Sequence, residues 1–300
     1  MDRNPAASAR RHPPQSNRET GRKAFSVRAA EWINLICFLF LSGLSCLRPM
    51  ARRRRAKVLG LGLLGMALVW VAKSSPNFLS PSASAVLRDW LPAALLLMPY
   101  WQAGQFFTKP DQELQDRLER LDRKWLGFLL GETGNRGTRS WRKGYFELTY
   151  LLCYPLVPLG LGALYWMGRQ LYVDQFWTVV LPPTYLCYVL LPFFPALPPR
   201  MLAEAGAPNK TESRLRRTNL WILRHASITA NVLPSAHVAA TVAVSLALLR
   251  FSLPVGLAFL WVSLSIAVGA VLCRYHYAVD SIAGAGLAVA GFLLVNCGLT

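Results

Sequence analysis

Long stretches without a charged residue recur along almost all of this 300-residue chain, and they constrain its fold more than any other feature. They comprise residues 32–47, 58–72, 90–108, 148–168, 175–199, 226–249, 251–273 and 281–300. A helix that crosses a bilayer needs about 20 mostly apolar residues, which most of these stretches provide. They are continuously apolar rather than alternating, which indicates helices and not the strands of a barrel. The sequence therefore predicts an all-α fold, a polytopic membrane helical bundle with a six-helix core and one or two N-terminal apolar helices.

The chain is expected to consist of three parts. Residues 1–28 are rich in Arg, Pro, Ser and Asn and are predicted to form a disordered basic tail. Residues 29–86 hold two short apolar stretches, 32–47 and 58–72, and each is expected either to span the membrane or to lie at its surface. Residues 87–300 are expected to form one membrane domain.

The charge of the chain indicates which kinds of partner it binds. The net charge is +18, and residues 1–57 alone hold 13 Lys and Arg against 3 acidic residues. Nucleic-acid binding is one interpretation, but basic segments beside apolar spans are typical of membrane proteins that meet anionic lipid. The sequence therefore predicts the bilayer as a partner and predicts no binding to nucleic acid.

The six cysteines lie in apolar stretches without metal-type spacing, which indicates small buried side chains.

Residues 111–130 differ from the other segments because charged and apolar residues are interleaved in them. Leu114, Leu118, Leu121 and Trp125 recur at helical spacing. We expect an amphipathic helix that ends at Gly131 and lies either on the membrane surface or on the protein's own loops.

Two short motifs near the end of the chain each fall at the boundary of an apolar stretch. They are Pro234-Ser235-Ala236-His237 and Arg274-Tyr275-His276-Tyr277-Ala278-Val279-Asp280. The expected membrane topology places the two motifs on the same side of the membrane. The chain between Arg200 and His237 has no long apolar stretch, so it stays on one side of the membrane, and one helical hairpin then brings it back to that side before His276. Arg200, His237, His276 and Asp280 are therefore expected on one membrane face.

The residue types in these motifs suit chemistry on a phosphate group. His276 and Asp280 are four residues apart and share a helix face. The carboxylate can accept a hydrogen bond from one ring nitrogen and leave the other free as a nucleophile. His237 is placed to protonate a departing oxygen, which is the work of a general acid.

The remaining candidate residues would bind the phosphate oxygens. Arg200 and Arg274 carry planar donor groups that match phosphate. Ser235 can donate its hydroxyl, and the backbone amides of 234–237 open a helix whose N-terminus attracts anions. Two arginines supply the charge, so the chemistry requires no metal. Each piece alone is weak evidence, since an arginine at the end of a span usually anchors it to lipid, but the conjunction favours a phosphate site. His12 and His225 are given no role.

These residues resemble the type 2 phosphatidic acid phosphatase (PAP2) superfamily, and most closely its inositolphosphotransferase-like and inositol phosphorylceramide synthase-like branch. The resemblance extends over about residues 88–298. Its strongest parts are 194–200, 233–239 and 274–284, and residues 121–131 are also similar to that branch.

The resemblance implies a role for each candidate residue. His276 would attack phosphorus and form a phosphohistidine, Asp280 would orient it, and His237 would act first as acid and then as base. The phosphate-binding residues would be Arg200, Ser235 and Arg274. The family works without a metal or another cofactor and acts mostly on lipid phosphates and diphosphates.

The sequence also departs from the common family pattern. Phe193 stands where the first motif places a lysine, Met201 follows Arg200 where a proline is usual, and one residue rather than five separates Arg274 from His276. These departures fit the synthase-like branch better, and they leave the role of Arg274 less defined than the roles of the two histidines.

Three functions remain open from the sequence. If water resolves the phosphoenzyme, the protein is a phosphatase that acts on a lipid phosphate or polyprenyl diphosphate. This is the favoured hypothesis, because no feature of the sequence indicates a second substrate. Resolution by an alcohol makes a transferase that moves an inositol phosphate-like headgroup onto a lipid hydroxyl. A transporter or lipid-binding protein would use the basic face without chemistry.

The side of the membrane on which the site lies is open to two interpretations. The resemblance implies an extracytoplasmic site in a bacterial-type inner or plasma membrane. The basic segments 48–57, 109–143 and 200–224 all fall on the catalytic face if both early stretches span, which opposes the positive-inside tendency. An interfacial 32–47 segment would instead place the basic tail on the same side as the site.

Overall fold

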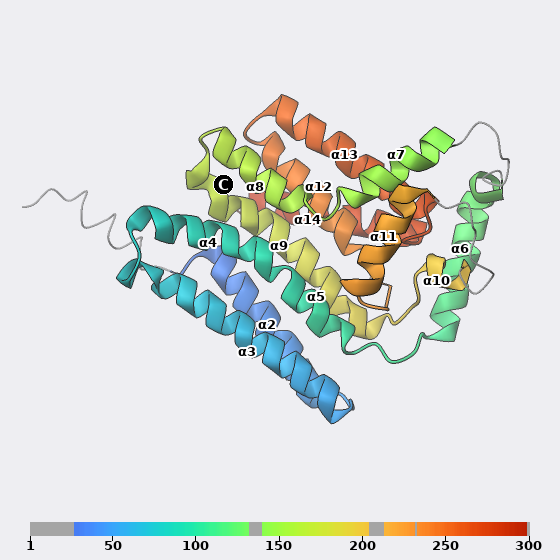
Figure 1. The fold of residues 1–300 in the computed structure, drawn as a ribbon, viewed down its shortest axis with the longest axis horizontal. Helices are drawn as coiled ribbons and strands as arrows, with labels where there is room; N and C mark the ends of the chain where they lie inside the picture. Colours follow the sequence, from blue (N-terminus) through green and yellow to red (C-terminus); the bar gives the residue numbers. More distant parts are fainter. Residues whose placement is uncertain (1–26, 132–139, 204–212, 232, 299–300) are drawn as a thin grey trace, which may run out of the picture.

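The computed structural model describes residues 27–131, 140–203, 213–231 and 233–298, and the described chain forms a helical bundle (Figure 1). Apart from one isolated bridge between Ala196 and Asn231, its regular elements are helices. This confirms the predicted all-α polytopic bundle. All but the last two residues of the predicted disordered tail lie outside the described residues.

Five described helices are long and apolar enough to cross a membrane. They are α2 (Ala29–Leu47), α3 (Arg52–Ser74), α9 (Val173–Leu190), α13 (Leu253–Leu272) and α14 (Ala278–Cys297), of which α3 and α9 are extended by short 3-10 turns. Large apolar side chains on their outer faces are exposed, as a lipid solvent requires: Leu63 is 68% exposed, Trp261 69% and Leu294 74%. The chain is an integral membrane protein by these features.

The N-terminal helices α2 and α3 pack side by side, and α2 also lies along α9. The first turn of α2 is fixed to α9, because the backbone amides of Ala29 and Ala30 donate to Asp174 at 3.1 and 3.0 Å. A buried ion pair between Arg88 and Glu31, with a shortest distance of 2.7 Å, joins α2 to α4. The early stretches therefore belong to the bundle, and α2 has the length of a span rather than of a short surface segment.

Two predicted spans are each divided into a pair of helices. The apolar stretch 148–168 falls in α7 (Ser140–Leu151) and α8 (Leu156–Trp166), which are bent by 69° relative to each other. Pro155 accounts for the break, since proline disfavours helical backbone in the residue before it and donates no amide hydrogen bond. The predicted span 90–108 consists of α4 (Pro81–Leu95) and α5 (Leu97–Gly104).

The helix α4 begins before the apolar stretch 90–108, in a segment rich in Ser and Pro. Ser80 caps it by accepting from the amide of Ala83 at 3.3 Å, and Pro81 occupies the first helical position, where no amide donor is needed. The predicted domain boundary at residue 86 falls within this helix, and the division into domains stays a prediction.

The centre of the bundle is α12 (Ala236–Leu249), which packs against α8, α9, α13 and α14. Its small side chains are almost all buried and allow close approach of the neighbouring helices. Hydroxyl groups join it to α13: Ser263 donates to the Thr241 carbonyl at 2.8 Å and pairs with the Ser245 hydroxyl at 2.8 Å. This packing sets the position of His237 on the first turn of α12.

Three helices gather at one end of the bundle, at the right of Figure 1: α6 (Gln112–Gly131), α10 (Pro199–Ala203) and α11 (Arg214–His225). Of the two placements expected for residues 111–130, the structure shows the helix packed on the protein's own loops. Leu118 is buried in a cluster with Ala196 and Tyr277, while Trp125 is half exposed.

The basic turn between α2 and α3 lies at this same end. Arg48 donates to the Pro192 carbonyl at 2.7 Å and Arg54 donates to the Phe107 carbonyl. The C-terminal end of α14 lies at the opposite end of the bundle, at the left of Figure 1. The described parts of the basic segments therefore lie at the end that carries the predicted site residues.

Candidate active site

The two C-terminal motifs meet through their backbones. The amide of Ser235, just before α12, donates to the carbonyl of Asp280 in the first turn of α14 at 2.9 Å. Gly284, one turn further along α14, makes this approach possible, because a Cβ at that position would lie 2.4 Å from the Ser235 carbonyl oxygen. The residues predicted to share a membrane face are thus adjacent.

The predicted nucleophile and its carboxylate are buried together. His276 is 5% exposed and Asp280 is fully buried. Nδ1 of His276 lies 3.4 Å from Oδ2 of Asp280, which is longer than a good hydrogen bond but within ion-pair range. The same Oδ2 accepts from the Tyr277 amide at 3.0 Å, so Asp280 also caps α14. This arrangement leaves Nε2 of His276 as the ring nitrogen that faces away from the carboxylate.

Asn231 completes the surroundings of Asp280, and the sequence analysis missed it. Its Nδ2 donates to Oδ2 of Asp280 at 2.7 Å, and its backbone amide donates to the Ala196 carbonyl at 2.7 Å. Asn231 is 1% exposed. It therefore ties the loop before Arg200 to the carboxylate that holds His276. The only signal in the sequence is a lone asparagine three residues before Pro234, which predicts no contact by itself.

Replacing Asn231 with alanine is expected to lower turnover about 10- to 100-fold, because a buried carboxylate that loses a donor costs roughly 1–3 kcal/mol. Asn231 donates to Asp280 and not to either histidine, so kcat is expected to fall while KM stays unchanged. Asn296→Ala is the matched control, since Asn296 bonds only within the far end of α14. A rise in KM at constant kcat, measured in steady-state phosphate release, would contradict a role in positioning Asp280.

His237 faces His276 across the site. The two ring centroids are 5.7 Å apart, and Tyr150 and Tyr154 flank the His237 ring at 5.9 and 5.7 Å. Nδ1 of His237 is buried and has no hydrogen-bond partner among the described residues. The two rings are therefore close without being bonded to each other.

The three predicted phosphate-binding residues differ in their placement. Arg200 is 9% exposed and lies within electrostatic range of His237. Ser235 is fully buried, and its hydroxyl accepts from the Val238 amide at 3.5 Å as the cap of α12. Arg274 has an exposed side chain and a left-handed backbone with φ of 62°. The structure brings Arg200 and Ser235 to the histidines, whereas Arg274 lies at the outer edge.

Buried polar atoms without a hydrogen-bond partner concentrate at this site. Among the described residues they include atoms of His237, His276, Asp280, Asn231, Ser281 and Tyr154. Such groups are rare in folded proteins and each needs an explanation, of which a polar ligand is one. Of these, Nδ1 of His237 and the hydroxyls of Ser281 and Tyr154 can donate, whereas the oxygens of Asp280 and Asn231 only accept, so the clustering favours a site that binds a polar group. The described residues contain no group of three or more His, Cys, Asp and Glu that could hold a metal ion.

A buried polar network supports the loop that carries His276. Glu147 on α7 accepts from the Tyr275 hydroxyl at 2.6 Å, from Asn219 at 2.7 Å and from Arg216 at 3.3 Å. The Tyr275 ring stacks on Tyr150 with centroids 3.9 Å apart. Burial raises the pKa of Tyr275, so this hydroxyl remains a donor to the carboxylate. The sequence analysis missed this network, since its members come from three distant segments.

The helix α6 closes the other side of the site. Gln115 donates to the Tyr277 hydroxyl and accepts from the Leu197 amide at 2.9 Å. Asp122 accepts from the Ala278 amide at 2.9 Å, at the N-terminus of α14. Burial raises the pKa of Asp122, and the charge of Arg274 opposes this effect. The helix α6 therefore holds together the loop at Leu197, just before Arg200, and the start of α14.

A helical membrane bundle with two histidines, a carboxylate and a buried arginine at one end is typical of enzymes that act on lipid phosphates. A family model described as the PAP2 superfamily matches residues 121–294, and the chain belongs to this superfamily. Searches of curated proteins and of solved structures found no match. Membership confirms the resemblance at the level of the superfamily and gives the protein a lipid-related function of the phosphatase or phosphotransferase type. The inositolphosphotransferase-like branch stays a prediction.

Proposed function

We propose that this protein is a metal-independent phosphohydrolase that removes phosphate from a lipid phosphate or polyprenyl diphosphate through a phosphohistidine. The observation that carries the proposal is the convergence of His237, His276 and Asp280 with the buried Arg200, from segments far apart in the chain. The resemblance also favours an extracytoplasmic site, with the basic N-terminal tail on the opposite side of the membrane.

The first step transfers the phosphoryl group to the enzyme. Nε2 of His276 attacks phosphorus, the bond between phosphorus and the leaving oxygen breaks, and His237 gives that oxygen a proton. Asp280 stabilises the positive charge that develops on the His276 ring. Arg200 and the Ser235 hydroxyl donate to the oxygens that gain charge in the transition state.

The second step releases the phosphate. His237, now neutral, takes a proton from water, and the water oxygen attacks phosphorus while the bond to His276 breaks. The products are inorganic phosphate and the original enzyme. Arginine supplies the fixed positive charge in both steps, so the proposal needs no metal ion.

The test is phosphate release by detergent-purified protein with EDTA present, on phosphatidic acid, a sphingoid phosphate and a polyprenyl diphosphate. We expect release that EDTA does not change, and an acid-labile, base-stable phosphoenzyme after rapid quenching. Loss of release on chelation, or a phosphoenzyme stable to acid, would contradict the proposal. Release that requires added inositol or diacylglycerol would instead identify a phosphotransferase, and lipid binding without release a transporter or binding protein.

A further inference from the structure

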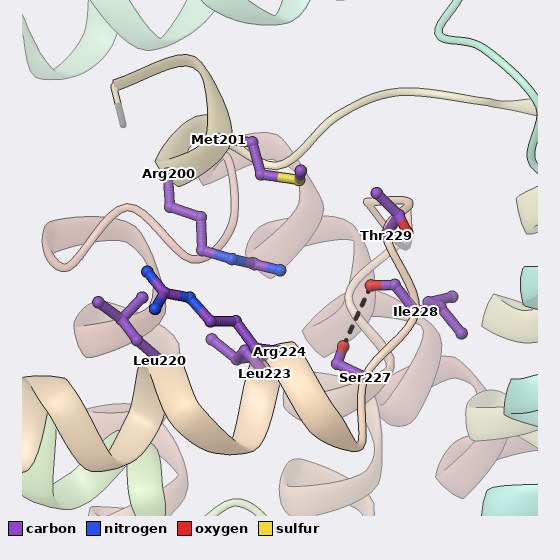
Figure 2. Close-up of a pocket in the computed structure, with 8 residues that line it drawn as sticks. All are labelled: Arg200, Met201, Leu220, Leu223, Arg224, Ser227, Ile228 and Thr229. Carbon is purple, nitrogen blue, oxygen red and sulfur yellow. Dashed lines mark hydrogen bonds between the residues drawn. The ribbon is translucent and has the colours of Figure 1, made fainter. Parts of the chain in front are cut away.

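A cavity of about 160 Å³ lies between α10 and the end of α11, beside the candidate active site. Its lining residues are Arg200, Met201, Leu220, Leu223, Arg224, Ser227, Ile228 and Thr229 (Figure 2). Arg200 belongs to both places, since it lines this cavity and acts on His237. Arg200 is therefore the residue that this cavity shares with the proposed phosphate site.

Two arginines line this cavity, and neither has a partner of opposite charge among the described residues. In Figure 2 the two side chains run past each other, with the Arg200 guanidinium group turned toward the side of Ser227 and the Arg224 guanidinium group turned toward Leu220. Among the described residues, neither guanidinium group makes a hydrogen bond or an ion pair, although Arg200 is 9% exposed. Arg224 is exposed, so solvent screens part of the repulsion between the two like charges. An anion bound beside both guanidinium groups would be attracted to each of them.

The loop at the far wall of the cavity is held in place by α5. Trp101 donates its indole N–H to the Ala226 carbonyl at 3.0 Å, and the Ile228 amide donates to the Tyr100 hydroxyl at 3.1 Å. Gly104 lets the loop approach, because a Cβ there would lie 2.3 Å from the Ile228 side chain. The cavity wall is thus fixed before a ligand binds, which lowers the cost of binding.

The lining combines cations with apolar side chains. Leu220 and Leu223 are buried beside Arg224 on α11, Met201 follows Arg200, and Ile228 lies on the facing loop, so apolar side chains are interspersed with the two arginines (Figure 2). A volume of 160 Å³ is about five times the share of one water in the liquid. Such a space fits a phosphate group together with the first carbons of a hydrocarbon chain, rather than a free ion alone.

We propose that this cavity is a second phosphate subsite, and that the substrate is a lipid diphosphate ester. This inference rests on the proposed function and extends it. The terminal phosphate lies against His276 and Arg200, and the esterified phosphate lies between Arg200 and Arg224. Attack by His276 breaks the bond between the terminal phosphorus and the bridging oxygen, and that oxygen leaves on the lipid monophosphate. Arg224 then stabilises the leaving phosphate, whose charge increases in this step.

The test compares farnesyl diphosphate with farnesyl phosphate, which differ only in the second phosphate. The wild-type kcat/KM is expected to be at least about tenfold higher on the diphosphate than on the monophosphate. Arg224→Gln is expected to lower kcat/KM roughly 10- to 100-fold on the diphosphate but less than about threefold on the monophosphate. Arg217→Gln is the matched control, because Arg217 lies two turns earlier on α11, outside the cavity. Arg217→Gln is expected to leave kcat/KM unchanged on both substrates.

Equal losses on the two substrates in Arg224→Gln, or a wild-type preference for the monophosphate, would overturn the subsite. A second readout separates this inference from the proposed function. Inorganic diphosphate is expected to raise the unfolding temperature of the wild-type protein more than inorganic phosphate does, and Arg224→Gln to remove that difference. Protection without phosphate release would uphold the subsite and overturn the hydrolase, whereas release from both esters without selective protection would overturn the subsite alone.

Discussion

Phosphate release is expected to fall by at least about 10⁴-fold when His276 is replaced with alanine, because removal of a covalent nucleophile abolishes the reaction path that the remaining groups support. His276 lies between the carboxylate of Asp280 at 3.4 Å and the ring of His237 at 5.7 Å between centroids. Among the described residues the only other histidine in this group is His237, and no carboxylate pairs with it, so it is not expected to replace His276 as the nucleophile. The measurement is single-turnover phosphate release together with trapping of the phosphoenzyme.

His225→Ala is the matched control for this variant. His225 is exposed at the end of α11, and its ring bonds to the Trp221 carbonyl at 2.8 Å within its own helix. Wild-type turnover is expected from it. A His276→Ala protein that still forms an acid-labile phosphoenzyme would rule out His276 as the nucleophile, provided that its chromatographic profile matches that of the wild type.

The two histidines can be told apart by the leaving group. A substrate with a good leaving group, such as p-nitrophenyl phosphate, needs little protonation of the departing oxygen. His237→Ala is therefore expected to recover part of its activity on that substrate, whereas His276→Ala is not. Equal losses on both kinds of substrate would assign His237 a role other than general acid.

Gly284→Ala is expected to be the most damaging substitution outside the histidine pair. Its Cβ would lie 2.4 Å from the carbonyl oxygen of Ser235, and a backbone atom cannot rotate away as the end of a flexible side chain can. The loop before α12 must shift, which costs about 1–3 kcal/mol of stability. A shift of about 1 Å at the reacting groups lowers turnover about 100-fold.

Gly286→Ala tests the same change two residues further along α14. No atom lies within 4 Å of a Cβ at Gly286, so this variant is expected to keep wild-type activity. Alanine also favours helix over glycine by about 0.5–1 kcal/mol, which predicts an unchanged or slightly raised unfolding temperature. Turnover and thermal unfolding in detergent check both variants. Wild-type turnover in Gly284→Ala would show that the contact between the two motifs does not position the site.

The amphipathic helix α6 shows where sequence reasoning reaches its limit. The spacing of Leu114, Leu118 and Leu121 predicts the helix and its apolar face, and the structure confirms a helix that ends at Gly131. The same spacing suits a membrane surface and a protein surface equally, because both are apolar. The hydrogen bonds of Gln115 to Leu197 and of Asp122 to Ala278 place α6 on the protein's own loops, and the sequence does not predict these contacts.

The sequence by itself determined the helical membrane bundle and the common location of the motifs. Uncharged stretches of this length must satisfy their backbone groups internally, and in this chain only helices do so. The chain crosses and returns between His237 and His276, so both emerge at the same end whatever the details of packing. These conclusions need only the length of each stretch and the order of the motifs.

The tertiary structure alone decided how the helices are rotated and how deeply they meet. In a membrane protein the core-facing and lipid-facing sides of a helix are both apolar, so hydrophobicity specifies neither the rotation nor the depth. The contact of Asn231 with Asp280, the approach of Gly284 to Ser235 and the cavity shared by Arg200 and Arg224 all depend on those two quantities. They join residues from separate segments, and only the packed bundle brings them within bonding distance.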